Sequence, residues 1–154
     1  MMSVVGKPDA SSCGMTTNLC KGGACGEVIF LLNDTGSATA VGTVCRIGYD
    51  TTLNKLSAVA VADAAVRERI VVSAEVVASG SYGRFWIRGS GITATVADTT
   101  YTADDGLRMY DGTVTDMTAG YAFDDNEFGV VETGGDTTTS IVITLLGRES
   151  LGET

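Results

Sequence analysis

The chain has 154 residues, enough for a single domain with a sizeable core, and it carries a formal net charge of −9 at pH 7. It contains no histidine, which excludes Ser-His-Asp and Cys-His catalysis in their usual forms and removes the commonest zinc ligand. No run of about 18 apolar residues is present, so we expect no membrane-spanning segment. The N-terminus lacks the basic start and apolar core of a signal peptide, which predicts a reducing compartment.

Residues 1–26 are rich in Gly, Ser and Thr and have only scattered apolar side chains. Such a segment cannot build its own core, so we expect an extended N-terminal arm that becomes ordered on assembly. Residues 27–154 are then predicted to form a single β domain.

Four cysteines occur in the chain, at Cys13, Cys20, Cys25 and Cys45. A reducing compartment favours free thiols, and Cys45 lies in an alternating segment where a small core residue fits. Two alternatives stay open: a disulfide, and a Cys₄ zinc site for which only Cys20 and Cys25 approach the usual ligand spacing. We predict neither a bound metal nor a cofactor.

The first half of the β domain shows three strand signals. Residues 27–32 form an apolar run typical of a strand buried on both faces. Residues 39–49 alternate between apolar and polar side chains, as expected for a strand with one buried face. Residues 58–69 fit a helix as well as a strand, and we expect a strand followed by one helical turn.

The most informative segment is residues 70–89, which predicts two strands joined by a turn that contains Gly80. After the turn, Phe85 and Ile87 share one face and are assigned to the core. The opposite face carries an unusual set, predicted to be a protein contact surface because Tyr, Trp and Arg are enriched at interfaces: Tyr82, Arg84, Trp86 and Arg88. One alternative is that these long side chains cover the rim of the core. Another is that the aromatic rings stack on nucleic-acid bases, which the overall acidity of the chain disfavours.

The last third combines acidic loops with short strands. Between residues 98 and 136 ten acidic side chains accompany one basic residue, Arg108, which argues against binding to nucleic acid and favours a solvent-facing surface. A turn at residues 89–91 precedes a Thr-alternating strand at 92–96, and residues 137–147 are apolar on both faces, as in a central strand. The fold class is therefore predicted to be all-β: a small barrel or sandwich of short antiparallel strands with at most one short helix.

Paired carboxylates at 104–105 and 124–125, with Glu127, are the only candidates for acid–base chemistry. They follow neither the EF-hand pattern nor any nucleophile motif, so we interpret them as solvated acidic loops. No catalytic residue is predicted, and the chain is expected not to be an enzyme.

The order of segments resembles head decoration (cement) proteins of tailed bacteriophages. The similarity rests on VGTVCRIGYD, the hairpin VVASGSYGRFWIRG, the Thr-alternating strand and the terminal TTTSIVITLLGR, and covers roughly residues 39–148. It implies a β-rich virion protein, made in the bacterial cytoplasm, that binds the major capsid protein on the outer surface of the head. It also implies self-association, with a trimer favoured, and no membrane partner.

We therefore expect a non-catalytic capsid decoration protein, which contacts its partners through residues 82, 84, 86 and 88. Two alternatives remain. One is another virion component, such as a tail, knob or fibre-associated protein. The other is a carbohydrate-binding or adhesin-like β domain, for which an exposed Trp and acidic loops would also serve.

Overall fold

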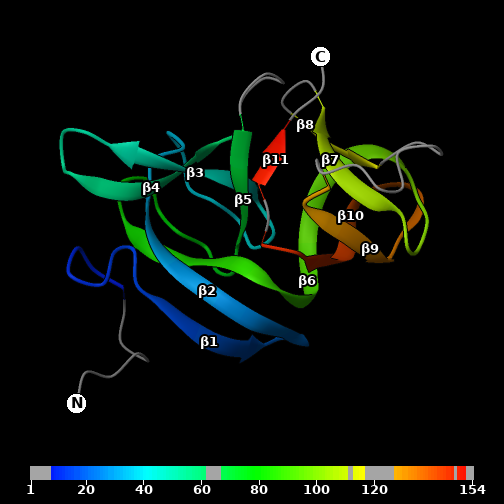
Figure 1. Cartoon of the computed structure of the whole chain (residues 1–154), viewed down its shortest axis with the longest axis horizontal. Coiled ribbons are helices and arrows are strands. Elements are labelled where there is room, and N and C mark those ends of the chain that lie inside the picture. Colours follow the sequence, from blue (N-terminus) through cyan, green and yellow to red (C-terminus); the bar gives the residue numbers. More distant parts are fainter. Residues whose placement is uncertain (1–7, 62–66, 111–112, 117–126, 148, 152–154) are drawn as a thin grey trace.

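The structure is a computed structural model that describes residues 8–61, 67–110, 113–116, 127–147 and 149–151 (Figure 1). These residues contain strands and turns but no helix, and therefore no helix able to cross a bilayer. The strands are β1 (Thr16–Lys21), β2 (Ala24–Asn33), β3 (Val44–Asp50), β4 (Lys55–Ala60), β5 (Arg67–Ser73), β6 (Tyr82–Tyr101), β7 (Gly106–Tyr110), β8 (Thr113–Asp116), β9 (Gly129–Thr133), β10 (Gly135–Leu145) and β11 (Glu149–Leu151).

The strands form one mixed sheet in the order β1-β2-β4-β3-β5-β6-β10-β9-β7-β8, and β11 pairs with β5. An additional antiparallel pairing joins β2 to β6. This pairing closes β2, β4, β3, β5 and β6 into a ring, in which only the short β2–β4 contact is parallel. The first half of the chain is therefore a small β-barrel, and the predicted all-β fold class is confirmed.

The barrel interior is filled by alternate residues of its strands, as the two-residue period of a strand requires. Phe85 is fully buried there, and Ile87 is 6 % exposed, which confirms their assignment to the core. The complete set of buried side chains in this cluster is Ile29, Leu31, Cys45, Ala58, Val71, Val77, Phe85 and Ile87.

A second core lies against the outside of the barrel. It contains Val28 and Phe30 of β2, Ile70 and Val72 of β5, and side chains from β6, β9 and β10. Strand β2 is thus buried on both faces, as predicted, because the barrel interior covers one face and the outer core covers the other.

Strand β6 belongs to both parts of the molecule. Its first half, from Tyr82 to Ser90, pairs with β2, and the stretch from Gly89 to Tyr101 pairs with β10. The strand bends at Gly89 and Gly91, where φ is +146° and +69°. A Cβ on Gly91 would lie 2.4 Å from the carbonyl oxygen of Gly23, so this close approach requires glycine.

Several strand predictions are confirmed. Residues 70–73 and 82–89 lie in strands β5 and β6, which pair antiparallel through residues 72–73 and 85–86, and residues 137–145 lie in a central strand between β6 and β9. The expected turn at residues 89–91 is wrong, because the backbone bends there without leaving the sheet. The helical turn expected near residues 61–69 falls largely on residues 62–66, outside the described part.

The N-terminal segment differs from the predicted extended arm. Residues 16–21 pair with residues 24–29 in a hairpin, and β2 runs through the predicted boundary at residue 26. The hairpin turns at Gly22 and Gly23, which both have positive φ, as the favoured two-residue hairpin turn requires. Residues 16–21 and 24–26 therefore belong to the sheet, and residues 1–7 lie outside the described part.

Candidate interaction surface

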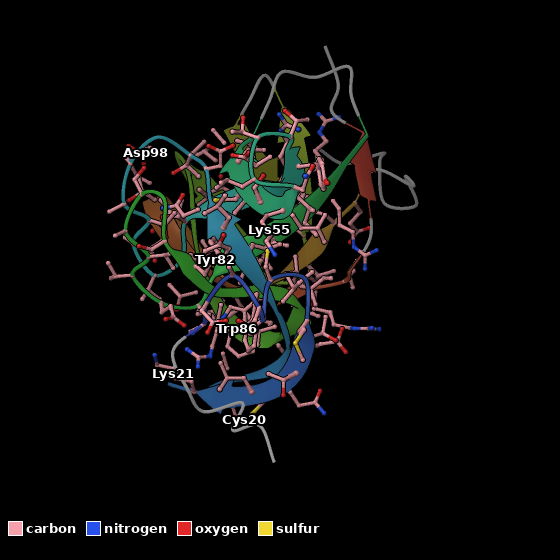
Figure 2. The ribbon with its side chains drawn as sticks, turned by 90° about the vertical axis from the view of Figure 1, so that its left-hand side faces the viewer. Cys20, Lys21, Lys55, Tyr82, Trp86 and Asp98 are labelled. Carbon is pink, nitrogen blue, oxygen red and sulfur yellow. A yellow bond between two sulfur atoms is a disulfide. The ribbon has the colours of Figure 1, made fainter. Side chains whose placement is uncertain are left out.

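Trp86 lies inside the molecule. Its side chain is 4 % exposed and belongs to the outer core. Figure 2 shows it between β6 and the β1–β2 hairpin. The loop at Val41 and Gly42 reaches across this region, and Thr95 of the second half of β6 donates a hydrogen bond to the carbonyl oxygen of Gly42 at 2.9 Å. Trp86 is therefore a packing residue, which corrects the expectation that it is exposed.

Arg84 is half-buried and held from two sides. Its Nη1 lies 2.9 Å from Oε2 of Glu75, and its guanidinium carbon lies 5.5 Å from the centre of the Phe30 ring. A guanidinium over an aromatic face is a favourable cation–π contact. The arginine thus lies against apolar surface while its charge is neutralised, as the alternative interpretation of this face expects.

Arg88 is the most exposed member of the predicted set. Its Nη2 lies 3.2 Å from Oε1 of Glu27, directly across the β2–β6 pairing. The arginine side chain is 60 % exposed, so this ion pair contributes little to stability. Arg88 is the member whose side chain is most available to another molecule.

The four predicted residues therefore do not form one exposed surface. Strand alternation places Tyr82, Arg84 and Trp86 on one face, as predicted, but that face is covered around Trp86 and becomes accessible toward Tyr82, which is half-buried. A bulge between Glu27 and Val28 interrupts the register before Arg88. The proposed contact role stays a prediction, to which Arg88 and the accessible parts of Tyr82 and Arg84 can contribute.

The cysteines divide into a bonded pair and two free thiols. Cys20 and Cys25 face each other across the β1–β2 hairpin, with their Cα atoms 4.1 Å apart, and form a disulfide. The expectation of free thiols is wrong for this pair, because the tight turn brings the two side chains together. Cys13 and Cys45 are free. Burial raises the pKa of the Cys45 thiol to about 11.

Metal binding finds no support in the described residues, where no three His, Cys, Asp or Glu side chains come together. Asp104 and Asp105 shape a turn: Asp105 Oδ2 accepts a hydrogen bond from the amide of Thr102 at 3.1 Å, and both backbones pair with Val131. Asp124 and Asp125 lie outside the described residues.

Two grooves flank β1. One is shallow, with a volume of about 670 Å³, and runs past the disulfide, the Glu27–Arg88 pair and the end of β10. The other, of about 330 Å³, lies on the opposite face between β1 and the Glu75–Arg84 pair. Both linings are mainly apolar, so both grooves suit the side chains of another protein better than a polar metabolite.

The end of the β3–β4 hairpin is a second exposed surface, which was not predicted from the sequence. Tyr49 and Leu56 are cross-strand partners that are 56 % and 37 % exposed, and Leu53 in the turn is 53 % exposed. Tyr49 and Leu56 continue the barrel-facing rows that contain Cys45 of β3 and Ala58 of β4. Figure 1 shows this end of the β3–β4 hairpin projecting from the rest of the ribbon. A signal was present, since alternation places Tyr49 with Cys45 and Ile47.

The local structure holds this apolar hairpin end in place. The amide of Leu53 donates to Oδ1 of Asp50 at 2.8 Å, and the Tyr49 hydroxyl donates to Oδ1 of Asn54 at 3.3 Å. Lys55 Nζ donates to the carbonyl oxygen of Ala10 at 2.9 Å, which ties the hairpin to the segment that precedes β1. Its apolar side chains are therefore presented by an ordered backbone.

Comparison of the chain with models of protein families, with curated proteins and with solved structures found no significant match in any of the three.

Proposed function

We propose that this chain is a non-catalytic virion protein that decorates the outer surface of a bacteriophage head by binding its major capsid protein. The sequence resemblance motivates the proposal. The observation that supports it best is the exposed apolar end of the β3–β4 hairpin, formed by Tyr49, Leu53 and Leu56. Adjacent exposed apolar side chains on an ordered backbone are typical of protein contact sites.

The charge distribution is compatible with attachment from outside. Among the described acidic residues, Asp104 and Asp105 pair with Val131 of β9, and Glu132 lies in β9 itself, whereas the apolar hairpin end lies on the barrel. A molecule that attaches through the hairpin can leave the acidic part in solvent. Attachment of many copies to a symmetric shell then gives avidity from modest individual contacts.

The carbohydrate-binding alternative is weaker than the sequence alone suggested. It rested on an exposed Trp that could stack on a sugar ring, and Trp86 is 4 % exposed. A tail or fibre-associated role shares the same surfaces and is separated from head decoration only by where the protein binds on the particle.

The direct test mixes the purified chain with undecorated heads and separates bound from free protein by sedimentation. We expect saturable binding and a raised temperature of head disruption. Replacement of both Tyr49 and Leu53 by Ser should weaken binding about tenfold or more, because central apolar contacts each contribute about 1 kcal/mol or more. Absence of any binding by the wild-type chain would refute head decoration.

Val76→Ser is the matched control. Val76 is 69 % exposed in the loop between β5 and β6, so its replacement also removes exposed apolar surface, but outside the hairpin end. We expect normal binding for this variant and unchanged thermal unfolding for both. Equal binding by the two variants would show that the hairpin end is not the contact.

A further inference from the structure

Strand β1 leaves one edge of the sheet unpaired within the described residues. It ends the strand order and pairs only with β2. Backbone bonds alternate along an antiparallel pair, and the bond from the amide of Phe30 to the carbonyl oxygen of Met15 fixes the phase of that alternation. Residues 15, 17, 19 and 21 therefore face β2, and the backbone N–H and C=O groups of Thr16, Asn18 and Cys20 point outward.

This edge lacks the features that usually protect a sheet edge. Between Thr16 and Lys21 there is no proline, and the only charge is Lys21 at the end of the strand. The disulfide between Cys20 and Cys25 fixes β1 to β2 at the turn. The result is a short, rigid edge in which three alternate residues have outward-facing backbone groups available for pairing.

We propose that β1 is a self-association site, where β1 of a second copy pairs antiparallel with it about a two-fold axis at Asn18. This register places Asn18 opposite Asn18 and Thr16 opposite Cys20 of the other copy, so every outward backbone group finds a partner. It also places Thr17 opposite Leu19 and Lys21 opposite Met15. No like charges face each other across the pair.

The surroundings of β1 favour a second copy as the occupant. Glu75 and Glu27 are each neutralised by an arginine, Arg84 and Arg88. Strands β7 and β8 are at the other end of the strand order, and Figure 2 shows Cys20 and Lys21 at the opposite end of the molecule from Asp98. Two chains of net charge −9 therefore approach through β1 with little repulsion.

The two grooves give the added strand room on both faces. Side chains of a paired strand alternate between the faces of the sheet. On one face they meet the groove of about 330 Å³ lined by Leu19 and Ala74, and on the other the groove of about 670 Å³ beside the disulfide. In strand addition, main-chain bonds supply affinity and such grooves supply selectivity. This inference does not depend on capsid binding.

The test compares Asn18→Pro with Asn18→Ala by sedimentation velocity over a range of concentrations. Proline removes the outward N–H and leaves the β1–β2 bonds in place, whereas alanine keeps the N–H. We expect a dimer for the wild type and for Asn18→Ala, and its loss for Asn18→Pro. A wild-type chain that stays single or forms a trimer, or an Asn18→Pro variant that still dimerises, would overturn the proposal.

A second variant covers the case in which Asn18→Pro fails to fold. Asn18→Lys keeps the backbone but puts two like charges at the two-fold axis, so dimerisation should weaken and partly recover in high salt, while Asn18→Gln should dimerise normally. Amide exchange supplies an independent readout. In the dimer, the amides of Thr16, Asn18 and Cys20 should exchange about tenfold more slowly or better than in the monomer. Protection of these amides only after heads are added would overturn self-pairing.

Discussion

The barrel core and the outer core are built from the two faces of the same strands, and they differ in where their residues come from. The barrel core collects alternate side chains from residues 29–87. The outer core combines the outer faces of β2 and β5 with residues of the last third, up to Leu145. The difference shows that an apolar outer face on the strands of a barrel can be part of a core and not a contact surface, because a later segment of the same chain can cover it.

Substitutions of the adjacent residues Phe85 and Trp86 give the strongest test of whether both cores stabilise the fold. Phe85 points into the barrel and Trp86 into the outer core. We expect Phe85→Ala and Trp86→Ala each to lower the free energy of unfolding by about 3–5 kcal/mol, because each leaves a large cavity. Urea denaturation followed by circular dichroism measures both losses.

Trp86 is the only tryptophan, so its fluorescence reports on the outer core. In Phe85→Ala the fluorescence and circular dichroism transitions should coincide, because β6 runs through both cores. Two separated transitions would show that the cores unfold independently. A small loss for Trp86→Ala would instead indicate that this side chain is not packed as described.

A second test concerns the barrel core alone and uses pH. Burial raises the pKa of Cys45 from its ordinary value of 9.0 to about 11. Above pH 9 the unfolded chain loses this proton while the folded chain keeps it, so stability is full below pH 9 and falls as pH rises toward 11, by roughly 2–3 kcal/mol. Cys45→Ala should remove this part of the pH dependence of the free energy of unfolding, which denaturation curves at pH values from 8 to 11 measure. An unchanged pH dependence in the variant would contradict the burial of a protonated thiol.

The smallest expected effect belongs to the disulfide at the outer edge. Cys20 and Cys25 are five positions apart, and a loop this short implies a contribution of about 2 kcal/mol from the reduced entropy of the unfolded chain. Replacement of both by Ala should lower the melting temperature modestly and leave the barrel intact. Calorimetry measures the change, and the single variant Cys13→Ala serves as the control because Cys13 is a free thiol.

The sequence predicts the parts of the fold that depend on local alternation. Strand positions, the burial of Phe85 and Ile87, and the central strand at residues 137–145 all follow from it. Whether the other face of a strand meets solvent depends on distant segments. Trp86 was misassigned because its cover comes from the loop at Gly42 and from the second half of β6.

The disulfide was missed for a different reason. The prediction of free thiols rested on the expected reducing compartment. Gly22-Gly23, however, is a strong signal for a two-residue hairpin turn, and such a turn places Cys20 opposite Cys25. The exposed hairpin end at Tyr49 and Leu53 shows another limit of prediction from alternation. The pattern predicts which side chains of β3 share the barrel-facing side, but not how far along the strand the rest of the barrel covers that side.

The length of β6 has a consequence for synthesis on the ribosome. The strands of the barrel are complete once residue 90 has emerged, because β6 pairs with β2 and β5 through its residues 82–90. The apolar outer faces of β2 and β5 then stay exposed until residues 92–145 have been synthesised and cover them. A nascent chain that stalls in this interval exposes Val28, Phe30 and Val72 to solvent, and such exposed apolar surface is where chaperones bind and aggregation begins.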